Sequence, residues 1–126
     1  MRERTAKAVL CSPALCDAEI AATVMGGAWK PTLLVTLHEH GSVRFGALGR
    51  LVGDPTPRVL TRQLRELEAD GMVVRTVYAQ VPPKVEYSLT PLGEGSIPLL
   101  RMLAQWGADY AAPHRDDAAG RDAPAH

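Results

Sequence analysis

Residues 56–90, TPRVLTRQLRELEADGMVVRTVYAQVPPKVEYSLT, decide the fold because they predict a helix followed at once by a two-stranded hairpin. Thr56 has the hydroxyl with which an N-cap accepts a hydrogen bond from the first turn. Pro57 suits the first helical position, where a missing backbone N–H costs nothing. Asp70-Gly71 marks the other end, because glycine is the usual residue just beyond the last turn. The stretch therefore predicts a helix from residue 57 to residue 70.

The side chains of this helix fall on two opposite faces when each residue advances by about 100°. The apolar face carries Leu60, Leu64 and Leu67. The polar face carries Arg58, Thr61, Arg62 and Arg65. Arginines at this spacing suit the phosphates and base edges of DNA, but they also occur on helix faces that meet only water. In that second interpretation Arg62 would pair with Glu66, and Arg65 with Glu68.

The hairpin is predicted by alternating apolar and polar residues. They alternate over residues 85–89, which predicts a half-buried strand, and the partner strand is expected over residues 72–78. Pro82-Pro83 stiffens the connection and cannot extend the ladder. A helix followed by such a hairpin is the layout of a winged helix-turn-helix, whose second helix enters the DNA major groove. The predicted fold class is α+β, mainly helical.

The remainder of the chain is predicted to contain short helices, one minimal strand and two unstructured ends. We expect a flexible arm over 1–12 and a disordered tail over 112–126. The winged helix-turn-helix and dimerisation domain then covers 13–111. Its further elements are expected to be helices over 17–25, 31–40 and 45–52, a strand over 43–45, and a long terminal helix that begins at Pro91.

The terminal helix carries a wide apolar stripe. At alternating heptad spacing the stripe consists of Leu92, Leu99, Leu103, Trp106 and Tyr110. Pro98 either kinks this helix or marks its first turn. The stripe packs on its own core or on a second copy of the chain, and a chain of 126 residues has room for a single core. Dimerisation is therefore favoured, through Leu99, Leu103, Trp106 and Tyr110.

Charge is segregated along the chain, although the formal total is zero. Residues 44–84 contain seven basic and four acidic residues, whereas residues 85–126 contain three basic and six acidic ones. The positive part includes the predicted helix and hairpin, which resemble a DNA-binding unit; we call this unit the reading head. Its surplus of three charges is small, so a monomer is expected to bind DNA weakly and a dimer to be needed.

The composition argues against several other classes of protein. No apolar run approaches the length of a membrane span, and the N-terminus is a poor signal peptide. Two cysteines are too few for a disulfide framework, which favours a reducing cytoplasm. His38 and His40, beside Glu39, have no apparent third ligand, so neither a metal nor another cofactor is expected. No phosphate-binding loop, nucleophile elbow or pair of carboxylates near a histidine indicates an enzyme.

Several segments together resemble the HxlR-type transcription regulators, which are small winged-helix relatives of the MarR regulators. The segments are GGAWKPTLLVTL (26–37), SVRFGAL (42–48), PRVLTRQLRELEADGMVVRTVY (57–78), VPPKVEYSLTPLG (81–93) and Trp106-Gly107. The resemblance covers residues 13–110, and VPPKVEYSLT joined to RVLTRQLRELE is its most specific part. It implies a homodimeric DNA-binding regulator whose terminal helix and first helix form the dimer interface.

Two copies are expected to read a near-palindrome of double-stranded DNA with half-sites about one helical turn apart. Bases are expected to be met by Arg58, Thr61 and Arg62, and phosphates by Arg44 and Arg65. Lys84, in the wing, is expected to add a contact to the DNA backbone that is independent of sequence. The full predicted DNA-binding set is Arg44, Thr56, Arg58, Thr61, Arg62, Arg65 and Lys84.

Two short segments depart from the family pattern. Where the family has GGKW, this chain has Gly27-Ala28-Trp29, so one basic contact is lost, although Lys30 follows. The turn before the recognition helix is Gly-Ile-Ser in the family and Asp54-Pro55-Thr56 here, which is acidic and stiffer. The second difference bears on the angle at which the helix enters the groove.

Cys16 lies thirteen residues before Trp29, where a subset of this family carries a cysteine that senses quinones, aldehydes or oxidants. A thiol in the first turn of a helix has a lowered pKa, because the backbone N–H groups favour the thiolate. The alternative is a small buried residue that only packs. Cys11 is either a resolving thiol or incidental.

Two functions remain open at this point. The first is a dimeric regulator whose DNA affinity changes when a thiol-reactive or other small-molecule effector engages Cys16 or a pocket. The second is a winged-helix protein repurposed as a small-molecule-binding protein or enzyme that uses the cavity of the dimer. The alignment of Arg58, Arg62 and Arg65 favours the first, since a repurposed protein has no need to keep it.

Overall fold

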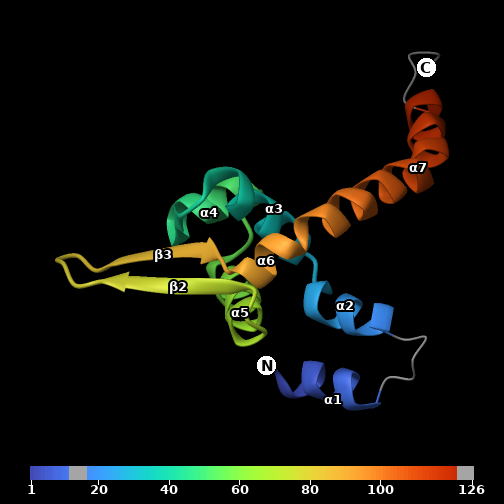
Figure 1. Ribbon diagram of the computed structural model, residues 1–126. Helices are drawn as coiled ribbons and strands as arrows, with labels where there is room; N and C mark the ends of the chain where they lie inside the picture. Colours follow the sequence, from blue (N-terminus) through green and yellow to red (C-terminus); the bar gives the residue numbers. More distant parts are fainter. Residues whose placement is uncertain (12–16, 122–126) are drawn as a thin grey trace.

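A three-stranded sheet lies among helices in the computed structural model, which describes residues 1–11 and 17–121 (Figure 1). A long terminal helix projects away from the other elements. In chain order the elements are α1 (Glu3–Cys11), α2 (Asp17–Met25), α3 (Lys30–His40), β1 (Val43–Arg44), α4 (Phe45–Val52), α5 (Pro57–Ala69), β2 (Val73–Tyr78), β3 (Lys84–Leu89), α6 (Pro91–Gly95) and α7 (Ile97–Arg121).

The apolar core joins α3, α4, α5 and the sheet in one cluster of buried side chains. The apolar face predicted for α5 is confirmed, since Leu60, Leu64 and Leu67 are at most 2% exposed. Burying one such leucine is worth about 1.5–3 kcal/mol. The three together therefore hold α5 firmly against the core. The partners from α3 are Leu33, Leu34 and Leu37, all fully buried.

The sheet has the strand order β1-β3-β2, and both strand pairs are antiparallel. β3 is central, so Tyr87 lies opposite Val43 on one side and opposite Arg75 on the other. Tyr87 is buried in the core, whereas β2 is exposed beyond Val73. The β2–β3 hairpin extends away from the helices as a wing (Figure 1). The predicted winged helix-turn-helix fold is confirmed.

The terminal helix is divided, whereas the sequence predicted one long helix from Pro91. α6 and α7 are separated at Ser96, whose hydroxyl donates a hydrogen bond to the carbonyl of Gly93 at 2.6 Å. Pro98 follows in the first turn of α7, where it needs no hydrogen-bond acceptor. Of the two alternatives for Pro98, the structure therefore has the first turn and not the kink.

Both ends of the chain contain helix where the sequence predicted none. The expected flexible arm over 1–12 includes α1, and the expected disordered tail over 112–126 begins inside α7. The tail is rich in alanine, the residue with the highest helix propensity, so α7 continues into it as far as Arg121. Residues 12 and 122–126 lie outside the described part of the chain.

Asp70, which follows the last residue of α5, anchors the first turn of α1. Its carboxylate accepts hydrogen bonds from the Arg2 backbone N–H at 2.9 Å, from Arg2 Nε at 2.8 Å and from the Thr5 hydroxyl at 2.9 Å. Burial raises the pKa of Asp70, but the donors outweigh burial and leave the pKa below its ordinary value of 3.8. No local pattern reveals this anchor, because Arg2 and Asp70 are 68 positions apart.

The anchor predicts acid sensitivity, because a lowered native pKa means that ionised Asp70 stabilises the fold above about pH 4. This contribution is lost as the pH falls through the native pKa. Asp70→Asn should therefore lower the free energy of unfolding near neutral pH by about 1–3 kcal/mol, and the difference from wild type should shrink in acid. Urea titrations across the acid range measure both effects.

Asp109→Asn is the matched control, because Asp109 is an exposed carboxylate that accepts a hydrogen bond from Gln105 within the same helix. It should change neither the stability nor its pH dependence. A loss in Asp70→Asn that stays the same in acid would show that Asp70 acts through packing and not through its charge.

Candidate nucleic-acid interface

The position of α5 is set by the tight turn that connects it to α4. Gly53 has a backbone φ of 111° and Asp54 a φ of 58°, both in the left-handed region. Glycine adopts this region freely and aspartate tolerates it. The Thr56 hydroxyl then accepts a hydrogen bond from the backbone N–H of Val59 at 3.2 Å, as the predicted N-cap. α4, the turn and α5 thus form a helix-turn-helix.

The outward face of α5 carries the predicted arginines. Arg58, Arg62 and Arg65 are exposed, and Thr61 is half-buried beside them. Among the described residues these three arginines form no ion pair. Their guanidinium groups are therefore available to an external anion.

Glu66 is the residue that could have paired with Arg62, but it has other partners. Lys30 Nζ lies 3.0 Å from Glu66 Oε1, and Arg2 Nη1 lies 3.4 Å from Glu66 Oε2. The alternative interpretation, in which Arg62 forms an ion pair with Glu66 within the helix, therefore does not hold.

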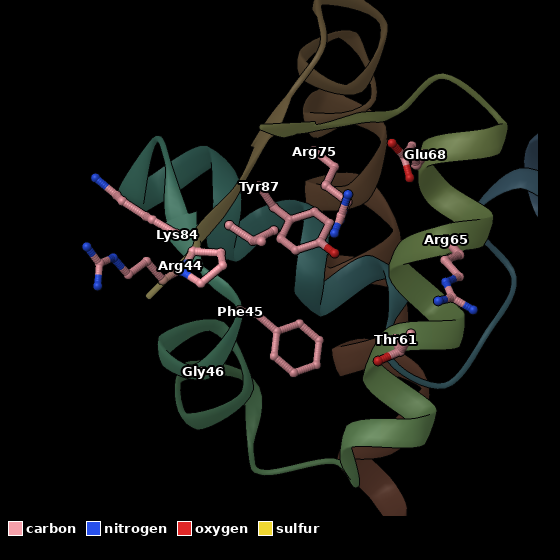
Figure 2. Close-up of a pocket in the computed structure, with 11 residues that line it drawn as sticks. Arg44, Phe45, Gly46, Thr61, Arg65, Glu68, Arg75, Lys84 and Tyr87 are labelled. Atoms are coloured by element: carbon pink, nitrogen blue, oxygen red, sulfur yellow. The ribbon is translucent and has the colours of Figure 1, made fainter. Parts of the chain in front are cut away.

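A groove of about 600 Å³ separates α5 from the wing (Figure 2). Thr61 and Arg65 face it from α5, while Arg44 and Lys84 lie on the opposite side. Glu68 is the one acidic residue among the described residues that line it. A groove with this charge suits a phosphate backbone. The basic residues of the groove are Arg44, Arg65, Arg75 and Lys84.

A second hollow, of about 550 Å³, follows the outer side of α5. Arg58 and Arg62 line it, so the structure places the two predicted base-reading arginines on a different side of α5 from the groove. Thr61 and Arg65 line both hollows. The predicted DNA-binding residues therefore form one continuous surface around α5, with Thr56 at its start as the cap.

Lys84 is less free than the sequence indicated. Its Nζ lies 2.7 Å from Glu86 Oε1 and 4.7 Å from the centre of the Tyr78 ring. Glu86 also accepts a hydrogen bond from the Ser42 hydroxyl at 2.7 Å. The bonds from Lys84 and Ser42 hold the pKa of the Glu86 carboxyl below its ordinary value of 4.5. Lys84 would therefore have to break an ion pair with the ionised Glu86 in order to bind an external anion.

Two basic residues at this surface were missed by the sequence analysis. Arg75 lies on β2 opposite Tyr87 and lines the groove. Pairing the two predicted strands residue by residue would have placed it there. Arg2 lines the outer hollow. No sequence signal pointed to Arg2, because it reaches this surface only through the fold.

The predicted dimerisation residues lie on an exposed side of α7. Leu99 is 37% exposed, Leu103 50%, Trp106 67% and Tyr110 65%. The rings of Trp106 and Tyr110 stack, with their centres 5.4 Å apart. An apolar groove of about 510 Å³ lies beside Leu99, between α1, α2 and the junction of α6 with α7. Contiguous apolar surface of this kind marks an interaction site.

The remaining candidate residues have structural partners or lie outside the described chain. Cys16 is among the residues not described, and Cys11 is the last residue of α1. His38 Nδ1 lies 2.6 Å from Glu94 Oε2, and His40 Nδ1 lies 3.0 Å from the carbonyl of Thr36. No group of three His, Cys, Asp or Glu side chains within the described residues could hold a metal ion.

A capped helix with a cationic outer face, preceded by a short helix and followed by a wing, defines a winged helix-turn-helix protein. The chain belongs to the HxlR-like helix-turn-helix family, which it matches over residues 24–115. It is thus an HxlR-type transcriptional regulator, the family that the sequence resembled.

Three similar proteins support this assignment. The chain is 44% identical over 110 residues to an uncharacterized HTH-type transcriptional regulator of Methanothermobacter thermautotrophicus, covering 87% of this chain and 82% of that one. It is 48% identical over 96 residues to the uncharacterized HTH-type transcriptional regulator YkvN of Bacillus subtilis, covering 76% and 80%. It also resembles the solved redox regulator HypR in its oxidized form, with a TM-score of 0.68, 47% identity and coverage of 75% and 96%.

These relatives are transcriptional regulators, in agreement with the prediction that this protein is not an enzyme. No single helix of the described residues is both long and apolar enough to cross a membrane. α2 and α3 meet that criterion only as a pair, which is bent by 75°. The leucines of α3 belong to the buried core.

Proposed function

We propose that this regulator acts as a homodimer that reads a near-palindromic operator in double-stranded DNA through α5. The observation that carries the proposal is the outward face of α5, where Arg58, Arg62 and Arg65 stand free of ion pairs within the described chain beside a cationic groove. Phosphate contacts supply much of the affinity of such proteins, and base contacts supply the sequence preference. The half-sites are then about one helical turn apart.

In this proposal the two hollows around α5 bind different parts of the DNA. The outer side of α5 enters the major groove and meets base edges, through Arg58, Thr61 and Arg62. The groove between α5 and the wing receives the DNA backbone, through Arg44, Arg65 and Arg75. These contacts are positioned by the buried leucines on the other side of α5.

Lys84 and Thr56 have weaker roles in this arrangement. Lys84 must break its ion pair with Glu86 before it can contact a phosphate. Its contribution to binding is therefore smaller than that of an unpaired lysine. That contact is independent of base sequence. Thr56 acts by capping α5, because its hydroxyl oxygen already accepts a bond from Val59.

Arg62→Ala should weaken operator binding by about 1–3 kcal/mol and relax the preference at one base position, since a bidentate contact from arginine to guanine is worth that much. Sequencing the DNA fragments that co-purify with the wild-type protein identifies the duplex to use. Fluorescence anisotropy at several salt concentrations then measures the affinity.

Arg101→Ala is the matched control, because Arg101 is an exposed arginine on α7 that lines neither hollow. It should bind the same duplex as the wild type does. If Arg62→Ala also keeps wild-type affinity, α5 is not the reading head.

The case for a homodimer rests on the apolar side of α7. Leu99, Leu103, Trp106 and Tyr110 are all more than one third exposed. Together with the adjacent apolar groove they offer the kind of surface from which a stable interface is built. A second copy related by two-fold symmetry covers this surface and also supplies the second reading head.

Trp106→Ala should weaken the dimer by about 3–5 kcal/mol, because a large aromatic residue is removed from a packed interface. Analytical ultracentrifugation measures the shift toward monomer. Gln105→Ala, next to it on the same helix, is the control and should leave the dimer intact, because Gln105 bonds to Asp109 within the helix. A wild-type protein that sediments as a monomer would refute the dimer.

A thiol-reactive effector acting at Cys16 is our proposal for the signal. Its support is the position of Cys16, thirteen residues before Trp29, and the likeness of the chain to HypR, which is named a redox regulator. Oxidation joins two thiols in a disulfide or caps one of them with a small thiol, and either product would strain the dimer that spaces the two reading heads.

Cys16→Ser should bind the operator as the wild type does when reduced, and should stop responding to diamide. Diamide takes up the two electrons and two protons that are released when a disulfide forms. Operator affinity is measured for both proteins with and without diamide, and Cys11→Ser tests whether the second thiol is required. If diamide leaves the wild-type affinity unchanged, the effector is a non-covalent ligand.

A further inference from the structure

Two carboxylates near the C-terminal end of α5, Glu66 within the helix and Asp70 just after it, lie close to its arginines. Glu66 follows Arg62 by one helical turn, and Asp70 follows Glu66 by one more. Negative charge is unfavourable here for two reasons, because the C-terminal end of a helix is itself partly negative and because DNA is a polyanion. An unpaired Glu66 would also attract Arg62, since residues four apart meet on a helix face.

Arg2 and Lys30 neutralise both carboxylates. Arg2 holds Asp70 through its backbone N–H and its Nε, and its Nη1 lies 3.4 Å from Glu66 Oε2. Lys30 Nζ occupies the other side of Glu66, 3.0 Å from Oε1. Burial raises the pKa of Glu66, but Lys30 and then Arg2 lower it below its ordinary value of 4.5. Glu66 is therefore ionised, and both of its oxygens face these cations.

Water screens the Lys30 and Asp70 side chains of this cluster only weakly. The Lys30 and Asp70 side chains are each 1% exposed, that of Arg2 is 15% exposed and that of Glu66 is 29% exposed. Interactions between charges are stronger at such sites than on an open surface. Arg2 nevertheless borders the outer hollow of α5, together with Arg58 and Arg62. It thus lies between Glu66 and Asp70 on one side and the surface proposed to meet DNA on the other.

We propose that Arg2 is a positioning residue for DNA binding, because it holds the carboxylates of α5 and so leaves Arg62 free to meet the duplex. Two cations, Arg2 and Lys30, balance Glu66 and Asp70, so neither of these carboxylates reduces the positive charge that Arg58 and Arg62 present. This inference rests on the proposed function of α5.

The guanidinium of Arg2 can be removed while other contacts keep α1 in place. The Thr5 hydroxyl still donates to Asp70 at 2.9 Å. Met1 and Val9 still line the apolar groove that α1 shares with α2, α6 and α7. Removing the guanidinium breaks its bonds to Asp70 Oδ2 and to the carbonyl of Thr23, each 2.8 Å long, and its contact with Glu66. The change that bears on DNA binding is at Glu66, whose Oε2 loses its partner and becomes available to Arg62.

The test compares three variants on the duplex that the wild-type protein selects, in low salt. Arg2→Ala should bind about three- to tenfold more weakly, since Glu66 recaptures Arg62 and the local charge falls by one. The double variant Arg2→Ala/Glu66→Gln should bind within about twofold of wild type, because no ionised Glu66 remains to hold Arg62. Arg4→Ala, at an exposed arginine in the first turn of α1, is the control and should bind normally.

Each contrary result has a distinct meaning. If Arg62→Ala binds as wild type, the proposed function of α5 fails. If Arg62→Ala loses affinity while Arg2→Ala keeps it, the inference about Arg2 fails and the proposed function stands. If Glu66→Gln does not restore binding to Arg2→Ala, Arg2 only supports the fold and the inference is overturned. Circular dichroism melting curves confirm that each variant is folded.

One further variant keeps the test decisive if Arg2→Ala does not fold. Glu66→Gln alone leaves Arg2 and its bonds to Asp70 unchanged. It should bind the duplex at least as tightly as the wild type, because the carboxylate that competes for Arg62 is gone. Weaker binding by a folded Glu66→Gln would contradict the inference.

Discussion

The burial of three leucines on one side of α5 determines the direction of every residue on its other side. Only one rotation of α5 about its axis buries Leu60, Leu64 and Leu67 in the core together. Any other rotation would expose them, at about 1.5–3 kcal/mol for each. Arg58 and Arg62 are out of phase with the leucines and therefore point outward. The orientation of the arginine face of α5 is a result of core packing.

The wing obeys a comparable constraint, which is the register of its strands. Tyr87 is buried, and a slip of one residue would move it into solvent and turn Glu86 inward. The observed register places Arg75 opposite Tyr87 and Lys84 opposite Tyr78. One core aromatic residue thus fixes which cations line the groove beside α5. The two walls of this groove are therefore set independently, one by a helix rotation and one by a strand register.

Local patterns were enough to predict most of this fold, because the cap at Thr56, the leucine spacing of α5 and the alternation in β3 each act over a few residues. The same patterns predicted which arginines face outward. They could not predict the partners of Arg2, which is 68 positions from Asp70, or the helix that this contact supports. They also missed the ion pair between Lys84 and Glu86: alternation places these half-buried residues on one face of β3, but it does not show that their side chains meet.

The shared carboxylate of Asp70 also has a dynamic consequence. Helix ends usually fray one by one, at little cost in free energy. Here the first turn of α1 and the end of α5 are bonded to the same side chain, so the opening of one removes bonds from the other. The two ends therefore form one cooperative unit, in which amide hydrogen exchange at the start of the chain reports on the last turn of α5.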